Sequence, residues 1–470
     1  MLHRLRHLKL NSDFNLKSVS DSSGSDPVMH AQKHISADGR KSIMVTIWQS
    51  RKLLMPALVA LIAVVVLPGC EDSDDAFMME TDSLSPVARA VAPQCSSAEK
   101  RRILDRDNPH HTVSLTCSLT LSANEEIPRR LILEGWAASN VKVNCNGGKI
   151  SPVFPPDYDE VPSGWLPSGD SVEIRSKEIT YSTWEVPTGV TLENCVIDGS
   201  IRVWGIARNG QGSEGSLRKL MQEWSKYADY TDRLRRYAPK NITLRHLQIR
   251  GRKVLRYTEE NGVERVEESA KTPLYIGPGV TGMRLEHSTL KGDSNGPGVY
   301  LDAESGNNQF YYNRFQVSTR SREQIAIDGS DSNSFWYNRI SGLNHGGLYL
   351  YRNGGEGGVS RINTPAFNEI KSNIFYYNTY RGDNPAVWLG SRTQRVKNGE
   401  ISFCDEDATH PLGSGRNDKD HAQVNSVRDN FVVKRSPSAV FESSGDYVDT
   451  PNYITGNQKV DSEPENDYGY

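Results

Sequence analysis

The sequence predicts a right-handed parallel β-helix, a solenoid in which every turn of the chain adds one strand to each of several parallel sheets. Two short apolar patterns alternate along the chain, and Gly- and Asn-containing turns rather than helices separate them. Equivalent positions are 25 residues apart from Leu285 to Phe310 and again from Phe310 to Phe335. A repeat of this length indicates a solenoid, and alternating segments without intervening helices favour strands.

In the first pattern, apolar residues expected to point inward alternate with residues expected to point outward. It occurs at 274–276, 299–302, 325–328, 348–351 and 387–390. The second follows after a short turn, at 190–195, 242–247, 283–288, 308–313, 333–338, 368–373 and 425–430. Four copies of the second pattern end in asparagine, namely Asn313, Asn338, Asn373 and Asn430. Asparagine tolerates left-handed turn geometry and bonds neighbouring backbone groups, so we expect a structural ladder of stacked Asn side chains.

Together the two patterns resemble the pectate-lyase-like right-handed parallel β-helix superfamily over about residues 110–460. The run Tyr-Leu-Tyr-Arg-Asn-Gly-Gly-Glu-Gly-Gly from Tyr349 to Gly358 is also similar to a run in uncharacterised bacterial β-helix lipoproteins. The resemblance implies the fold and brings no particular activity with it.

The N-terminal region predicts export. Arg51 and Lys52 precede an apolar run at 53–67, which is too short to span a membrane and ends in Leu-Pro-Gly-Cys. This ending resembles a bacterial lipobox and implies that Cys70 is lipidated and becomes the first mature residue. An ordinary cleavable signal and a single membrane anchor are the alternatives. The protein is thus expected in the cell envelope, facing the periplasm or attached to the outer membrane.

We therefore divide the chain into four parts: an extension or mis-called start at 1–50, a lipoprotein signal peptide at 51–70, a disordered tether at 71–94 and the β-helix domain at 95–470. Three insertions are expected in this domain, near 213–238, 353–365 and 392–420. The first has apolar residues at helical spacing and predicts a surface helix. Insertions leave a solenoid at its turns and usually gather on one face as a cleft wall.

Composition and cysteine spacing limit which nucleic-acid, disulfide and metal partners are expected. The formal net charge of −3 lacks the basic excess that nucleic-acid binding needs, so we expect no nucleic-acid partner. Cys95, Cys117 and Cys145 lie close in sequence, and one disulfide among them is expected in an exported protein. Cysteine spacing shows no metal motif, so no metal site is assigned, and Cys404 has no evident partner.

Strand alternation assigns the faces of the first pattern. Tyr275, Tyr300, Tyr349 and Trp388 are expected to point outward in one column that Ala326 interrupts. Aromatic rings beside small residues suit sugar rings, which predicts an exposed trough for polysaccharide. In the alternative, the inserted segments cover these rings and make a second small core.

Asp302 and Asp328 are expected beside this column, on rungs about 4.8 Å apart. Two carboxylates this close cannot both ionise cheaply, so one pKa should rise, as general-acid chemistry requires. The alternatives are a structural pair that caps backbone N–H groups where strands turn, and a cation site that would use calcium.

Further site residues cluster near the Gly-rich insertion. His345 or Tyr349 is the candidate base, and arginines are candidate partners for a sugar carboxylate. The polar residues in this group are Arg322, Arg352, Glu356 and Arg361.

Three functions remain open at this stage. The leading hypothesis is an enzyme acting on an acidic polysaccharide by β-elimination or C5 epimerisation, with Arg352 among its catalytic residues and with Tyr275, Tyr300, Arg322, Glu356, Arg361 and Trp388 binding the substrate. The second is a glycoside hydrolase that uses Asp302 and Asp328. The third is a non-catalytic polysaccharide-binding or envelope scaffold protein. The fold class does not choose between them.

Overall fold

The computed structural model describes residues 91–107, 111–152, 170–180, 183–206, 211, 224, 227–260, 263–353, 361–377, 384–390, 395–397, 400–402, 421–443 and 451–462. All of them belong to one compact unit, Thr81–Tyr470. The predicted extension, the signal peptide with Cys70 and most of the tether lie outside the described residues. Ala92 is already buried in the core and Gln94 pairs with Ser118, so the folded part begins slightly before residue 95.

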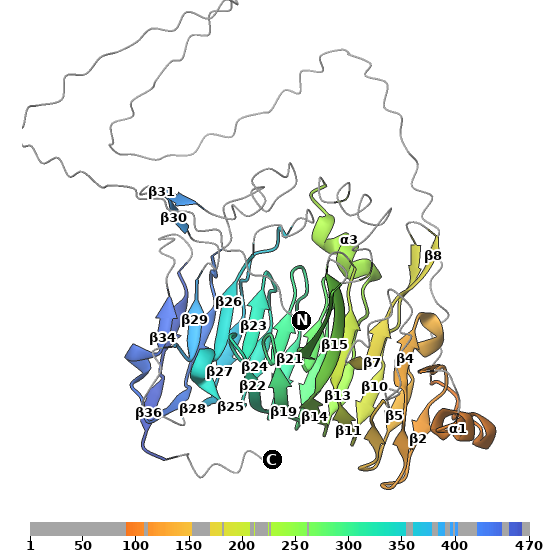
Figure 1. The fold of residues 1–470 in the computed structure, drawn as a ribbon. Coiled ribbons are helices and arrows are strands. Elements are labelled where there is room, and N and C mark those ends of the chain that lie inside the picture. Colours follow the sequence, from red (N-terminus) through yellow and green to blue (C-terminus); the bar gives the residue numbers. More distant parts are fainter. Residues whose placement is uncertain are drawn as a thin grey trace, which may run out of the picture. The chain divides into compact units, whose positions relative to one another are not determined.

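Three parallel sheets of ten strands each form a right-handed β-helix (Figure 1). The first sheet contains β1 (Thr112–Ser114), β4 (Arg130–Glu134), β7 (Asp170–Arg175), β12 (Ser200–Trp204), β17 (Leu274–Ile276), β20 (Val299–Leu301), β23 (Ile325–Asp328), β26 (Leu348–Tyr351), β29 (Val387–Leu389) and β34 (Phe441–Ser443). The second contains β2 (Leu119–Thr120), β5 (Lys142–Asn144), β10 (Thr191–Glu193), β13 (Thr243–Arg245), β18 (Arg284–Glu286), β21 (Gln309–Tyr311), β24 (Ser334–Trp336), β27 (Glu369–Lys371), β32 (Ser426–Arg428) and β35 (Tyr453–Thr455). The third contains β3 (Glu126–Ile127), β6 (Lys149–Ile150), β11 (Val196–Asp198), β14 (Gln248–Gly251), β19 (Thr289–Ser294), β22 (Arg314–Thr319), β25 (Arg339–Ser341), β28 (Ile374–Tyr376), β33 (Phe431–Val433) and β36 (Gln458–Val460). The predicted fold class is confirmed.

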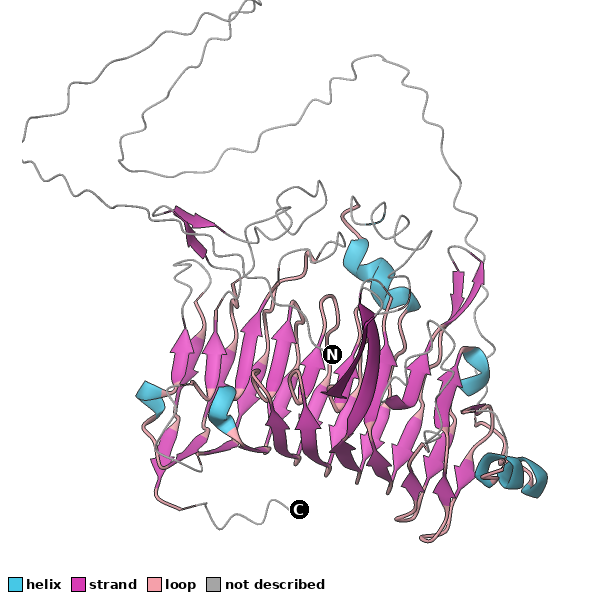
Figure 2. Cartoon of the chain, in the orientation of Figure 1, coloured by secondary structure: helices cyan, strands magenta, loops and turns pink. Residues whose placement is uncertain are grey.

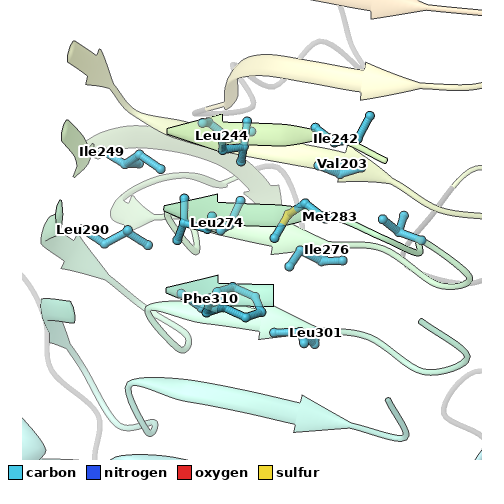
Figure 3. Packing of buried hydrophobic residues seen from close by; sticks show 14 of the residues in the cluster. Val203, Ile242, Leu244, Ile249, Leu274, Ile276, Met283, Leu290, Leu301 and Phe310 are labelled. Carbon is cyan, nitrogen blue, oxygen red and sulfur yellow. The ribbon is translucent and has the colours of Figure 1, made fainter. Parts of the chain in front are cut away.

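The core lies inside the solenoid, where inward residues of all three sheets meet. Leu274 and Leu301 come from the first sheet, Leu244 and Phe310 from the second and Leu290 from the third, and Figure 3 shows them converging. Each is fully buried. Burying a side chain of this size stabilises the fold by about 1.5–3 kcal/mol.

Asparagine ladders run along two corners of the solenoid. At the corner between the second and third sheets, the Asn338 Oδ1 accepts hydrogen bonds from Asn313 N and Nδ2, both at 3.0 Å, while Asn338 Nδ2 donates to the Phe310 carbonyl at 2.9 Å. Asn373 and Asn430 repeat this arrangement, which confirms the predicted ladder.

A second ladder, which the sequence interpretation missed, occupies the corner between the first and second sheets. It consists of Asn308, Asn333, Asn368, Asn425 and Asn452.

The left-handed residue at each corner is the one before the asparagine. Tyr312 has a φ of 56° and Tyr337 a φ of 58°, whereas Asn313 and Asn338 do not have positive φ. The expectation that asparagine itself takes up the left-handed geometry is therefore wrong. The preceding residue turns the chain, and the asparagine side chain is then free to bond the neighbouring rungs.

Helices and hairpins occur outside the three sheets (Figure 2). Helix α1 (Ser97–Leu104) begins at a Ser96–Glu99 capping box and buries Ile103. Of the predicted surface helix, α3 (Tyr230–Tyr237) is described, and it buries Tyr230 and Leu234. The short 3-10 helices are η1 (Trp136–Ala138), η2 (Leu343–His345) and η6 (Pro437–Ala439), and the antiparallel hairpins are β8 (Lys177–Thr180) with β9 (Thr183–Glu185), β15 (Lys253–Glu260) with β16 (Val263–Ala270), and β30 (Arg395–Lys397) with β31 (Glu400–Ser402). The last hairpin belongs to the insertion expected near 392–420.

Two disulfides tie the N-terminal rungs together. Cys95 bonds Cys117, as one bridge among the early cysteines predicts, and Cys145 bonds Cys195 across 50 residues. Cys404 lies outside the described residues. Among those that are described, no helix has the length and apolar character to cross a membrane.

We predict that Asn338→Ala lowers the free energy of unfolding by at least about 2 kcal/mol, because a buried amide and backbone N–H lose their partners. The measurement is the urea unfolding midpoint. Gln316→Ala, which removes an exposed amide from β22, is the matched control and should change stability by less than about 0.5 kcal/mol. Equal effects of the two substitutions would contradict a stabilising ladder.

Candidate functional site

The outer face of the first sheet carries the aromatic column that the sequence predicts. Register pairs Tyr275 with Tyr300, Tyr300 with Ala326, Ala326 with Tyr349, and Tyr349 with Trp388. All five side chains therefore follow one line across consecutive rungs. The predicted column and its interruption at Ala326 are confirmed.

The exposure expected for this face is wrong in its middle part. Asp302 and Asp328 are completely buried, and Tyr300 is only 8% exposed. Asn353 and Arg361, from the two sides of the predicted Gly-rich insertion, bond to the buried carboxylates. Asn353 and Arg361 thus cover this part of the face.

Asp328 binds both of these flanking residues. Its Oδ1 accepts from Asn353 N at 2.7 Å, and its Oδ2 accepts from Asn353 Nδ2 at 2.8 Å and from Arg361 Nη1 at 2.5 Å. The Tyr300 hydroxyl also donates to Oδ2. A carboxylate with this many donors anchors the chain on either side of 354–360.

Asp302 shares the same arginine. Arg361 Nη2 lies 3.1 Å from Asp302 Oδ1, and the Tyr275 hydroxyl donates to Oδ2. Burial raises the pKa of Asp302, the Arg361 charge opposes this shift, and the Asp328 charge adds to it. The burial and the Arg361 pairing favour the structural interpretation of the acid pair, and the guanidinium provides the positive charge that calcium would have supplied.

The half-exposed Tyr275 and the buried Tyr300, at the N-terminal end of the column, have their ring faces covered by protein. Tyr275 and Tyr300 are parallel, with ring centroids 5.1 Å apart, so each covers one face of the other. The Arg202 guanidinium lies 4.2 Å from the Tyr275 ring centroid and 4.0 Å from that of Trp204. These rings form the second core that was the alternative to an open trough.

Tyr351 fills the gap that Ala326 leaves. It packs with Ala326 and Tyr300, and its hydroxyl donates to Glu323 Oε1 at 2.8 Å. Arg322 Nη2 donates to the same hydroxyl at 2.5 Å and to Glu323 Oε1 at 2.7 Å. Sequence interpretation missed Glu323 and Tyr351 as partners of Arg322, since nothing in the pattern shows that a ring crosses to the neighbouring rung.

The Arg322 side chain is fixed but not hidden, with 22% of its surface exposed. Burial lowers the pKa of Arg322, but the hydrogen bonds and charge of Glu323 outweigh that effect and raise it. Arg322 is therefore a permanently charged donor held in one orientation.

The C-terminal part of the column stays half-exposed. Tyr349 and Trp388 are both partly accessible, and their rings meet edge to face at 65° with centroids 5.5 Å apart. Burial, and next the charge of Glu323, raises the pKa of Tyr349. Because a raised pKa keeps the phenol protonated at neutral pH, little phenolate is present to accept a proton, and Tyr349 is less suited to act as a base than expected.

His345 is exposed on η2, at the turn before β26. The backbone N–H of Gln324 donates to the Gly346 carbonyl at 3.1 Å, so the turn carrying His345 lies beside the turn carrying Arg322. Their predicted proximity at the entrance to the first sheet is supported by this backbone pairing.

The remaining predicted arginines are not accessible. Arg352 is fully buried and donates to the Ile362 carbonyl at 3.0 Å, and Arg361 is 4% exposed. The expectation that they contact a sugar carboxylate is wrong, because both are used inside the protein. Glu356 lies outside the described residues. Among the residues that are described, no group of three or more His, Cys, Asp or Glu is arranged to hold a metal ion.

Comparisons with known proteins find only distant likenesses among solved structures. No protein-family model and no curated protein matches the sequence. Among solved structures, the DFA-IIIase of Arthrobacter chlorophenolicus A6 without its lid is 9% identical over 79% of this chain and 86% of its own, with a TM-score of 0.31. The A-module of a mannuronan C-5 epimerase from Azotobacter vinelandii is 11% identical over 80% and 96%, with a TM-score of 0.29. A periplasmic alginate epimerase is 10% identical over 77% and 80%, with a TM-score of 0.27. At these values the likeness carries no argument about chemistry.

We predict that Arg361→Gln costs about 3–5 kcal/mol of unfolding free energy at neutral pH, since it leaves two buried carboxylates without their cation. The pKa of Asp302 is raised in the folded protein, so protonation of Asp302 stabilises the fold. This stabilisation is fully present below the ordinary Asp pKa of about 4, and it is lost as pH rises through the pKa that Asp302 has in the folded protein. Removing Arg361 raises the folded-state pKa of Asp302 further. The loss of unfolding free energy in the variant should therefore shrink as pH falls toward about 4.

The measurement is urea unfolding at both pH values. Arg428→Gln, which breaks the partly exposed Arg428–Glu369 pair, is the matched control and should cost less than about 1 kcal/mol. A deficit for Arg361→Gln that is equally large at both pH values would overturn the assignment.

Proposed function

We propose that this protein is an exported β-helix protein that binds an acidic polysaccharide on the outer face of its first sheet. The site consists of Tyr349, Trp388 and Arg322. The observation that carries the proposal is the Arg322 guanidinium, which is held by Glu323 and by Tyr351, whose ring centroid lies 6.3 Å from that of the half-exposed Trp388.

The aromatic part suits a pyranose ring. An edge-to-face pair leaves ring surface uncovered, unlike the parallel stack of Tyr275 and Tyr300. Sugar C–H groups pack on such surfaces while their hydroxyls bond polar neighbours. Tyr349 and Trp388 are therefore the platform, whereas the Tyr275 and Tyr300 rings cover each other.

The charged part suits a sugar carboxylate. Arg322 Nε and Nη2 bind Glu323 and Tyr351 and fix the guanidinium, so Nη1 is the group that would donate to a sugar carboxylate. Arg320 lies exposed just before it in the sequence, and Arg435 packs 4.6 Å from the Tyr377 ring centroid on a later turn of the same edge. Cations along this edge favour a polyanion over a neutral polymer.

A second candidate function is β-elimination or C5 epimerisation of the bound uronate, with His345 as the base. The exposed His345 turn beside the Arg322 turn favours it, since this chemistry needs a base near a neutralised carboxylate. Hydrolysis by Asp302 and Asp328 is not proposed, because both are buried against Arg361.

Export and lipid anchoring through Cys70 form part of the proposal. The Leu-Pro-Gly-Cys motif at 67–70 supports it, and so do two disulfides, which persist in oxidising compartments.

We predict that Trp388→Ala and Arg322→Gln each weaken binding of polygalacturonate at least about tenfold, because each removes a contact worth about 1.4 kcal/mol or more. Isothermal titration calorimetry measures the affinity. Trp336→Ala, which removes a half-exposed indole from the second sheet, is the control and should bind normally. Equal binding by all three variants, or equal affinity for a neutral dextran, would contradict the site.

The same mixtures test the enzymatic candidate. Elimination would release an unsaturated uronate that absorbs in the ultraviolet, and epimerisation would change the NMR signals of the polymer. His345→Ala should lower either rate at least about a hundredfold while leaving binding intact. Unchanged polymer in the presence of the native protein would leave binding as the function.

We predict that the mature protein is attached to a membrane through Cys70. Cys70→Ala should abolish incorporation of labelled palmitate and release the protein from the membrane fraction. An unchanged label in this variant would refute the lipobox assignment.

A further inference from the structure

A cavity lies at the end of the third-sheet strands. Its volume is about 500 Å³, within the range of small-molecule sites. It opens where hairpin β15–β16 leaves the solenoid, and its polar side chains are Ser151, Asp198, Arg250, Arg252, Lys253 and Asp293. We call it the third-sheet pocket.

Strand register explains why charged side chains gather here. Asp198 on β11 pairs with Arg250 on β14, so both point outward in one column. Gly251 pairs with Gly292, and a Cβ at Gly251 would lie 2.2 Å from the Asp293 carbonyl oxygen. Glycine alone lets these rungs approach so closely, and this brings Asp293 beside the start of β15.

The polar groups are partly preoriented. Arg250 Nη1 lies 3.6 Å from Asp198 Oδ1, and Arg250 Nη2 donates to Gln248 Oε1 at 3.3 Å. Arg252 Nη1 donates to the Pro152 carbonyl at 3.3 Å. The buried Arg250 Nε–H has no hydrogen-bond acceptor among the described residues. A ligand oxygen would satisfy that donor.

The combination of charges selects the ligand class. Three cations and two carboxylates line the pocket, an excess of one positive charge (3 − 2 = +1). Arginine and lysine bind a carboxylate, while aspartate oxygens and a serine hydroxyl accept or donate hydrogen bonds to sugar hydroxyls. Asp198 orients Arg250, and Asp293 would bind a sugar hydroxyl, which a simple inorganic anion lacks.

We propose that the third-sheet pocket binds one uronate unit, which makes it a second site for acidic sugars. The ligand class rests on the proposed function, but the pocket is built from other residues on another sheet. The pocket lies at the same corner of the solenoid as Arg322, because Arg320 N–H donates to the carbonyl of Ser294, the residue after Asp293, at 2.9 Å. One acidic polymer can therefore occupy both sites, and the pocket would extend the first-sheet site along the chain of the polymer.

Calorimetry with trigalacturonate tests the two sites separately in the full chain. We expect two binding events per native chain, one in Arg250→Gln, one in Trp388→Ala, and none when both are combined. Arg284→Gln, an exposed arginine on the second sheet, is the control and should keep both events. Arg250→Lys should restore part of the second event, and unfolding midpoints check that each variant is folded.

A failure of the third-sheet pocket and a failure of the first-sheet site give different results. Two undiminished events in folded Arg250→Gln would overturn the pocket, as would a single event in the native protein that Trp388→Ala removes. A single native event that only Arg250→Gln removes would support the pocket and refute the first-sheet site. Competition by inorganic phosphate at equal affinity would overturn uronate as the ligand class.

Discussion

Stacking of rungs in exact register at the corners is the constraint on which the rest of this structure depends. Asn308 bonds Asn333 across 25 residues, Asn333 bonds Asn368 across 35, and Asn368 bonds Asn425 across 57, with closely similar geometry. The ladder therefore does not depend on how much chain lies between two rungs. Insertions can leave at a turn without disturbing the sheets, because each corner amide still finds the next one in the same place.

The insertion after Tyr351 shows what such a segment can contribute. Register places Asp302 and Asp328 near each other on the outer face, where two buried carboxylates would destabilise the fold. Arg361 compensates both charges, and Asn353 bonds the second of them. The outer face consequently has a buried middle around Tyr300, Asp302, Asp328 and Arg361, with half-exposed aromatics on the rungs before and after it.

This division of the face moves the proposed site toward the edge with Arg322. There Glu323 and Tyr351 hold the guanidinium in place, so little side-chain freedom would be lost when a carboxylate binds. Tyr349 and Trp388 lie on the rungs that follow. The third-sheet pocket is assembled in the same way, from outward residues of stacked strands, at the corner where the third-sheet strands end and where Arg322 also lies.

The sequence by itself determined the fold class, the strand faces and the aromatic column, because a period of two residues and a repeat of 25 leave few other arrangements for Tyr275 through Trp388. The sequence also contained two patterns that were not interpreted, the Ser96–Glu99 capping box of α1 and the second set of asparagines. Only the tertiary structure decided that Arg361 neutralises Asp302 and Asp328, that Tyr351 crosses Ala326 to Glu323, and that Cys145 meets Cys195. These contacts join side chains from loops and neighbouring rungs, where no local period fixes direction, so they exist only once the rungs are stacked.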